Sequence, residues 1–316
     1  MSVLRPRPWL VVLPAALVAG ILGLSLWLSA SVHLAVSPQA NEPSGAVAPQ
    51  GGPRRVVSLD YCADQFVLEL LPREAIRALS PDAGSAFSFW RARAAGLPTV
   101  RPVAEDVLAL RPGVIVRSYG GGPKAAAFFE QAGVPVVQIG FAGSIDEVKA
   151  GLQRVAAALG VAQRAQARIR ELERRLARIE RPERPPQALY LTPAGVTSGR
   201  GTLVDDILQA AGFENYQTRP GWHPLPLERL VYEDPDRVAA AFFGLPTNHA
   251  DRWSATRHPV AQRTVRKRPV TMLEGAWTAC GGWFLIHAVE ALATDRRGAS
   301  NTGRTHAEAP SGHPSS

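Results

Sequence analysis

The chain has 316 residues, of which 46% are hydrophobic and 20% charged, and its formal net charge is +8. This length and apolar content suffice for two folded domains, which excludes a peptide, a coiled-coil rod and a disordered chain. The excess positive charge is concentrated in residues 164–184 and 251–268, and no zinc-finger spacing or ribonucleoprotein signature accompanies it. We therefore expect no nucleic-acid partner.

The N-terminal segment has the pattern of an export signal. Arg5 and Arg7 precede a stretch over residues 9–36 that contains no Asp, Glu, Lys or Arg. The apolar run is long enough to cross a bilayer, so residues 1–36 are predicted to be a signal peptide or a membrane anchor. Residues 37–53, rich in Pro, Gly, Ala and Ser, are predicted to be a linker. The rest of the chain would then lie in the periplasm, free or anchored to the inner membrane.

Short apolar runs alternate with helical periods in two stretches, residues 54–142 and 185–294. The predicted strands are residues 55–59, 113–117, 134–140, 187–192, 236–243 and 269–274, and the predicted helices are residues 63–71, 124–131, 202–211 and 283–293. This alternation favours an α/β fold with two Rossmann-like lobes, each built on a parallel sheet. Residues 295–316, rich in Ser, Gly, Pro and Thr, are predicted to be a disordered tail.

The two lobes are predicted to be joined by one long helix within residues 143–184. Apolar residues recur at helical spacing in this segment, Ser144 and Glu147 form a capping box at its start, and prolines from Pro182 onward end it. The segment is long for a single helix, and Gly160 is the point at which it would divide in two.

An internal likeness relates the two lobes. Residues 104–116 read AEDVLALRPGVIV and residues 227–239 read LERLVYEDPDRVA, and in each the acidic residue, Glu105 or Glu228, precedes a proline by seven positions. Combined with the shared rhythm of strands and helices, this predicts two pseudo-equivalent units that would grip a ligand from both sides.

No catalytic motif with its required context is present: the sequence lacks GxSxG, HExxH, a Walker loop and GxGxxG between a strand and a helix. The acids Asp60 and Asp64 stand at a strand end and a helix start, where carboxylates normally act as caps. No histidine lies between His33 and His223, so no metal site is predicted. The sequence leaves open whether its two cysteines, Cys62 and Cys280, form a disulfide.

Aromatic residues outside the predicted strands and helices are candidates for a ligand pocket, although each one could equally cover core. Tyr119 and Trp277 each follow a predicted strand, and open α/β sheets bind ligands at the carboxyl ends of their strands. Phe89 and Trp222 lie in predicted loops.

From about residue 54 to residue 293 the chain resembles the periplasmic substrate-binding proteins of ABC importers for cobalamin and ferric siderophores. The segments that carry this resemblance, in order along the chain, are RVVSLDYCADQ, VAEDVLALRPGVIV, LGVAQRAQ, TSGRGTLVDDILQAAGFEN and EGAWTACGG. The resemblance implies two α/β lobes joined by a long helix, a ligand bound between the lobes, an ABC permease and its ATPase as partners, and no enzymatic activity or cofactor.

The resemblance also implies roles for particular residues. Phe89, Tyr119, Trp222 and Trp277 would contact the ligand, while Glu105 and Glu228 would pair with arginines of the permease. Cobalamin is the preferred ligand because a large flat molecule stacks on aromatic rims. A ferric siderophore or haem would instead use arginines, for which Arg91, Arg117 and Arg200 are candidates.

Two other functions remain open from the sequence. One is a membrane-anchored enzyme that uses Asp60, Asp64, Asp205 and Asp206 with a divalent metal. The other is a membrane-tethered ligand sensor with the same fold.

Overall fold

The computed structural model describes residues 55–242 and 254–307, with side chains as far as residue 298. The predicted signal peptide or anchor and the linker after it lie outside these residues. Within the described part of the chain, no helix combines the length and the apolar character needed to cross a membrane.

The N-terminal lobe is a parallel four-stranded sheet in the order β2-β1-β3-β4. Its elements are β1 (Val56–Ser58), α1 (Tyr61–Leu70), the 3-10 helix η1 (Arg73–Ala75), β2 (Ile76–Ala78), α2 (Arg91–Ala94), α3 (Ala104–Ala109), β3 (Val114–Arg117), α4 (Ala125–Gln131) and β4 (Val136–Gln138). The central strand β3 is buried on both faces, because Val114 and Val116 join one hydrophobic cluster and Ile115 joins another.

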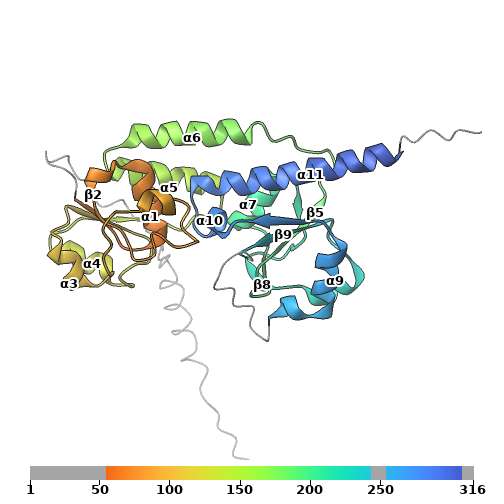
Figure 1. Cartoon of the computed structure of the whole chain (residues 1–316), viewed down its shortest axis with the longest axis horizontal. Coiled ribbons are helices and arrows are strands. Elements are labelled where there is room, and N and C mark those ends of the chain that lie inside the picture. Colours follow the sequence, from red (N-terminus) through yellow and green to blue (C-terminus); the bar gives the residue numbers. More distant parts are fainter. Residues whose placement is uncertain (1–54, 243–253, 308–316) are drawn as a thin grey trace, which may run out of the picture. The chain divides into compact units, whose positions relative to one another are not determined.

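The C-terminal lobe has a second parallel sheet in the order β10-β9-β5-β7, with a small antiparallel pair β6-β8 beside it. Its elements are β5 (Gln187–Leu191), β6 (Val196–Ser198), α7 (Leu203–Ala210), β7 (Glu214–Asn215), β8 (Trp222–Pro224), α8 (Leu227–Tyr232), β9 (Arg237–Ala241), η2 (Ala255–Arg257), α9 (Pro259–Lys267), β10 (Val270–Leu273), α10 (Gly275–Thr278), η3 (Trp283–Leu285) and α11 (Ile286–Ala307). Both lobes are visible in Figure 1.

The two sheets have the same topology. Counted along the chain within each lobe, the strands run in the spatial order second, first, third, fourth. The segments that match in sequence also match in structure, because α3 leads into the third strand of the first lobe and α8 into the third strand of the second. The predicted α/β fold with two similar lobes is therefore confirmed.

The connection between the lobes consists of two helices, α5 (Ile145–Ala158) and α6 (Ala162–Leu176), in place of one long helix. The break lies at Gly160, whose φ of 63° is in the left-handed region that ends an α-helix. The predicted cap at the start is present, since the Ser144 hydroxyl accepts a hydrogen bond from the N–H of Glu147. Helix α6 lies beside α11 (Figure 1), and Arg175 of α6 forms an ion pair with Glu290 of α11.

The C-terminal helix continues past residue 295, where the sequence predicts a disordered tail to begin. The first residues of that tail are held by the lobe: Arg237 donates a hydrogen bond to the carbonyl of Asp295, and Arg296 donates one to the carbonyl of Ala211. Helix α11 ends at Ala307, so it includes the first residues of the predicted tail.

Candidate functional site

Aromatic side chains that are not fully buried in the core follow the carboxyl ends of the parallel strands. Tyr61 opens α1 directly after β1, Tyr119 follows β3, and Phe242 follows β9 of the other lobe. This edge of a parallel sheet is where open α/β folds bind ligands.

Four rings form a continuous series across the lobe boundary, which we call the aromatic row: Tyr119, Tyr61, Phe87 and Phe242. The ring centroids are 6.1 Å apart between Tyr119 and Tyr61, 6.2 Å between Tyr61 and Phe87, and 6.4 Å between Phe87 and Phe242. Tyr119 is 54% exposed, and the other three rings are partly exposed. The row therefore offers apolar ring surface from both lobes.

The two phenols of the aromatic row interact with each other. Burial raises the pKa of Tyr119, and the nearby Tyr61 phenol and the Asp60 and Asp82 carboxylates raise it further. Burial is also the largest cause of the raised pKa of Tyr61. Both hydroxyls are thus protonated at neutral pH and lie together at the strand ends.

The predicted ligand residues fall into different surroundings. Tyr119 belongs to the aromatic row. Phe89 lies in a packed group of rings that we call the buried aromatic cluster: Phe89, Trp90, Trp283, Phe284 and His287. Trp283 and Phe284 are buried, and the other three are partly buried. Trp277 adjoins that cluster, with its ring 5.9 Å from the ring of His287. Trp222, on β8, is 53% exposed and lies 6.0 Å from the ring of Tyr190.

Within the buried aromatic cluster, the Phe89 ring stacks on Phe284 at 4.9 Å and on His287 at 5.4 Å and meets Trp283 edge-on at 5.5 Å. These contacts join the two lobes as core packing. They fit a structural role for Phe89 better than ligand contact.

Sequence reasoning missed Tyr61 and Phe242 as site residues. Each follows a strand at its carboxyl end, as Tyr119 does. That position was the signal by which they could have been found. Tyr61 was overlooked because it lies just before the predicted helix, and Phe242 because it lies within the predicted strand.

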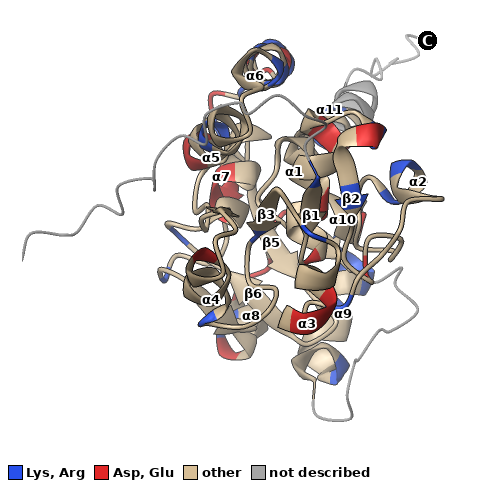
Figure 2. Ribbon diagram, turned by 90° about the vertical axis from the view of Figure 1, so that its left-hand side faces the viewer, with Lys and Arg blue, Asp and Glu red and all other residues tan. Residues whose placement is uncertain are grey.

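The two acids matched by the internal likeness occupy equivalent positions. Glu105 lies in the first turn of α3 and Glu228 in the first turn of α8, and both are exposed. Figure 2 shows the acidic stretch of α3 in red. Each helix returns to the start of the next parallel strand, so its N-terminus lies at the carboxyl-end edge of its sheet. Both carboxylates thus point outward from the end of the lobe that carries the aromatic row.

The four acids considered for a metal site are engaged in hydrogen bonds within the protein. Asp60 caps α1 and accepts N–H groups from residues 118–120. Asp64 accepts hydrogen bonds from the N–H and hydroxyl of Ser80. Asp205 accepts from Gln209 and Asn215, and Asp206 from the N–H of Ile145. Among the described residues, no group of three or more His, Cys, Asp or Glu is arranged to hold a metal.

The candidate arginines do not converge on the aromatic row. Arg117 is buried and donates to the carbonyls of Gly120 and Gly122 and to the side chain of Gln138. Arg91 donates to the carbonyl of Ser88. Arg200 lines a separate cavity of about 370 Å³ beside α7 and β7.

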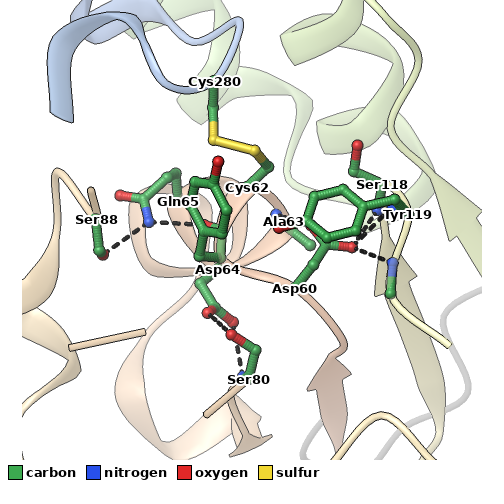
Figure 3. The surroundings of a disulfide bond; sticks show 12 residues. Asp60, Cys62, Ala63, Asp64, Gln65, Ser80, Ser88, Ser118, Tyr119 and Cys280 are labelled. Atoms are coloured by element: carbon green, nitrogen blue, oxygen red, sulfur yellow. Dashed lines mark hydrogen bonds between the residues drawn. A yellow bond between two sulfur atoms is a disulfide. The ribbon is translucent and has the colours of Figure 1, made fainter. Parts of the chain in front are cut away.

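Cys62 and Cys280 form a disulfide between α1 of the first lobe and the segment after α10 of the second (Figure 3). The bond connects residues 218 positions apart, directly beside Tyr61. It fastens the lobes together next to the aromatic row.

Comparisons with known proteins agree with this architecture. The family model described as periplasmic binding protein matches residues 72–241. A search of curated proteins finds no match. Among solved structures, the periplasmic heme-binding protein BhuT in complex with two hemes is 26% identical with a TM-score of 0.60, and the alignment covers 77% of this chain and 97% of that one.

Two further structures share the fold. The apo form of the periplasmic heme-binding protein RhuT from Roseiflexus sp. RS-1 is 23% identical with a TM-score of 0.61, covering 77% of this chain and 99% of that one. The periplasmic vitamin B12 binding protein BtuF of Vibrio cholerae is 18% identical with a TM-score of 0.53, covering 76% and 95%. With two like α/β lobes and a family match over more than half of its length, this chain belongs to the periplasmic binding protein family, the substrate-binding proteins of ABC importers.

Proposed function

We propose that this protein binds a flat metal-tetrapyrrole between its lobes in the periplasm and delivers it to an ABC permease. The observation that carries the proposal is the aromatic row, to which both lobes contribute partly exposed rings. A large flat macrocycle gains most of its affinity from such ring surfaces.

Haem fits the row better than cobalamin, which the sequence alone favours. The row presents two phenol hydroxyls side by side, from Tyr61 and Tyr119. A tyrosine oxygen is one of the protein ligands that hold haem iron. Cobalamin brings its own cobalt ligands and would use only the ring surfaces. The 26% identical structure that holds two hemes supports the same ligand class.

An anionic ferric siderophore is supported less well. Such a ligand calls for arginines at the site. Arg117 is committed to backbone carbonyls, and Arg200 lies at another cavity. The aromatic row thus favours a planar macrocycle with a large apolar face over a ligand that is recognised mainly through its charge.

We further propose that Glu105 and Glu228 dock the protein on its permease. They occupy equivalent first turns in the two lobes, both are exposed, and neither has an ion-pair partner among the described residues. Two outward carboxylates at the ligand-bearing end suit a partner with two basic sites, which would set docking orientation more than affinity.

Calorimetric titration of the full chain with hemin, cyanocobalamin and a ferric hydroxamate tests the ligand class. We expect saturable binding of hemin, weaker binding of cyanocobalamin and none of the hydroxamate. If a phenol oxygen becomes an iron ligand, its proton is released, so hemin affinity should increase with pH across the neutral range. Heat from the hydroxamate alone would contradict the proposal.

A further inference from the structure

The loop that carries Tyr119 is held by two buried side chains, those of Asp60 and Arg117. We call residues 118–122 the Tyr119 loop. The Asp60 Oδ2 atom accepts the backbone N–H groups of Ser118 at 2.7 Å, Tyr119 at 3.0 Å and Gly120 at 2.9 Å (Figure 3). Arg117 donates to the carbonyls of Gly120 and Gly122, each at 2.8 Å. Three N–H groups and two carbonyls of this loop thus bond to the side chain of Asp60 or Arg117.

Asp60 is itself fixed in place. Its other oxygen, Oδ1, accepts the N–H of Ala63 at 2.9 Å and so caps α1, and the residue is only 3% exposed. Two positions further on, Cys62 is bonded to Cys280 of the other lobe. A buried carboxylate with four N–H donors is costly to displace, because each lost hydrogen bond would leave a desolvated group unpaired.

The loop backbone needs such an external anchor. Gly121 and Gly122 have φ angles of 79° and 84°, in the left-handed region. A Cβ on Gly120 would lie 2.2 Å from the carbonyl oxygen of Leu59, so this residue must be glycine for the loop to lie against β1. Three consecutive glycines have little conformational preference of their own. The side chain that this arrangement presents is Tyr119, which is 54% exposed.

We propose that Asp60 is a positioning residue for ligand recognition: by accepting the three N–H groups of the Tyr119 loop, it holds the Tyr119 ring and hydroxyl against Tyr61 in the orientation that meets the ligand. This inference rests on the proposed function and deepens it. Asp60 acts through Tyr119 and touches no ligand itself.

A double-mutant cycle on hemin binding by the full chain tests this role. In Asp60→Asn, the amide oxygen still caps α1, but the NH2 group in place of Oδ2 donates and cannot accept the three N–H groups. We expect D60N to raise the hemin dissociation constant by about tenfold, comparable to one well-made contact. In the Tyr119→Ala background the same change should cost almost nothing, because the side chain it positions is gone. Additive losses would overturn the proposal.

The matched control is Asp64→Asn: Asp64 is a buried aspartate in the first turn of α1, and its carboxylate accepts hydrogen bonds from Ser80. D64N should bind hemin as the wild type does. If D60N behaves as D64N does, Asp60 has no positioning role.

A second readout needs no ligand. Titration of tyrosinate absorbance, compared with the matching Tyr119→Phe variant, reports the phenol of Tyr119, which faces Tyr61, Asp60 and Asp82. In D60N, loss of the Asp60 charge alone would lower the pKa of Tyr119, whether or not the loop moves. Gly120→Ala is therefore the decisive variant, because it keeps the Asp60 side chain and displaces the loop through the clash of its Cβ with Leu59.

In G120A we expect the phenol of Tyr119 to titrate nearer the ordinary value of about 10, and an unchanged titration would count against the proposal. A wild-type chain that binds no hemin, together with this shift in G120A, would refute the ligand and still support the positioning of Tyr119 by its loop.

Discussion

Two groups of aromatic rings lie where the lobes meet, and they differ in packing. In the buried aromatic cluster, Phe89 has four rings within 5.5 Å, and Trp283 and Phe284 are 6% and 1% exposed. In the aromatic row the rings are more than 6 Å apart, and Tyr119 is 54% exposed. The first group joins the lobes as core, whereas the second leaves ring surface and hydroxyls for a ligand.

The buried aromatic cluster and the aromatic row also differ in their polar groups. In the buried cluster, burial and the adjacent Arg175 lower the pKa of His287, so the imidazole is neutral and packs as a ring. In the aromatic row, the phenols are accompanied by Asp60 and by the loop it holds. The following predictions separate the structural group from the binding group.

Loss of a ring from the buried cluster should have the largest effect on stability. Phe89→Ala removes contacts to four rings and leaves a cavity, which we expect to lower the free energy of unfolding by about 3 kcal/mol. Chemical denaturation measures this loss. Phe87→Ala, the matched change in the aromatic row, should cost clearly less, and equal losses would erase the distinction between the two groups.

The disulfide between the lobes should stabilise the fold by a similar amount. The paired change Cys62→Ser and Cys280→Ser is expected to lower the free energy of unfolding by about 2 to 5 kcal/mol, because the bond closes a very long loop of chain. Denaturation without reductant measures it. Reductant should then destabilise the wild type and leave the double variant unchanged, and a wild type insensitive to reductant would contradict the pairing.

Asp64 should make stability depend on pH. Burial raises its pKa to about 7, above the roughly 3.9 of an unfolded aspartate. The folded state therefore holds this proton more tightly, so the contribution of Asp64 is complete below about pH 4 and is lost as pH rises toward 7, at up to about 1.4 kcal/mol per unit.

Asp64→Asn removes this dependence. The difference in unfolding free energy between wild type and D64N should fall between about pH 4 and pH 7 and level off above it. Denaturant titrations at several pH values give that difference. A flat profile would mean that Asp64 is ionised in the folded protein throughout this range.

The smallest effect on the isolated protein is expected at the two docking acids. Glu105→Ala with Glu228→Ala should leave the melting temperature and hemin affinity unchanged, because both side chains are exposed. Ligand uptake by cells carrying the cognate importer should nevertheless be lost. Glu130→Ala, an exposed acid on α4, serves as the control, and normal uptake by the double variant would remove the docking role.

Much of the fold could be predicted because periodicity reports burial. The strands at residues 114–117 and 237–241 are buried along their whole length, and apart from Arg117 and Arg237 at their ends they contain only apolar residues. The equivalence of Glu105 and Glu228 could be predicted for the same reason: the apolar residues around them follow the same spacing in α3 and in α8. Short elements such as β2 and β7 escaped notice because two or three residues carry no period.

The site was predicted less completely. Tyr119 could be chosen because it follows a strand, but the same type of residue in a nearby loop, Phe89, is enclosed by rings from the second lobe. The sequence does not reveal which aromatic residues in loops will pack against residues that are far away along the chain. For the same reason it could not pair Cys62 with Cys280, which only the docking of the two lobes brings together.

The central claim is that the aromatic row is the ligand site, and absorption titration with hemin tests it most directly. The variants are Tyr119→Ala and Phe242→Ala, one ring from each lobe, with Phe128→Ala, an exposed ring on α4, as the control. The account predicts that each row variant weakens hemin binding by about tenfold or more and that F128A binds as the wild type does. Wild-type affinity in both row variants would contradict it.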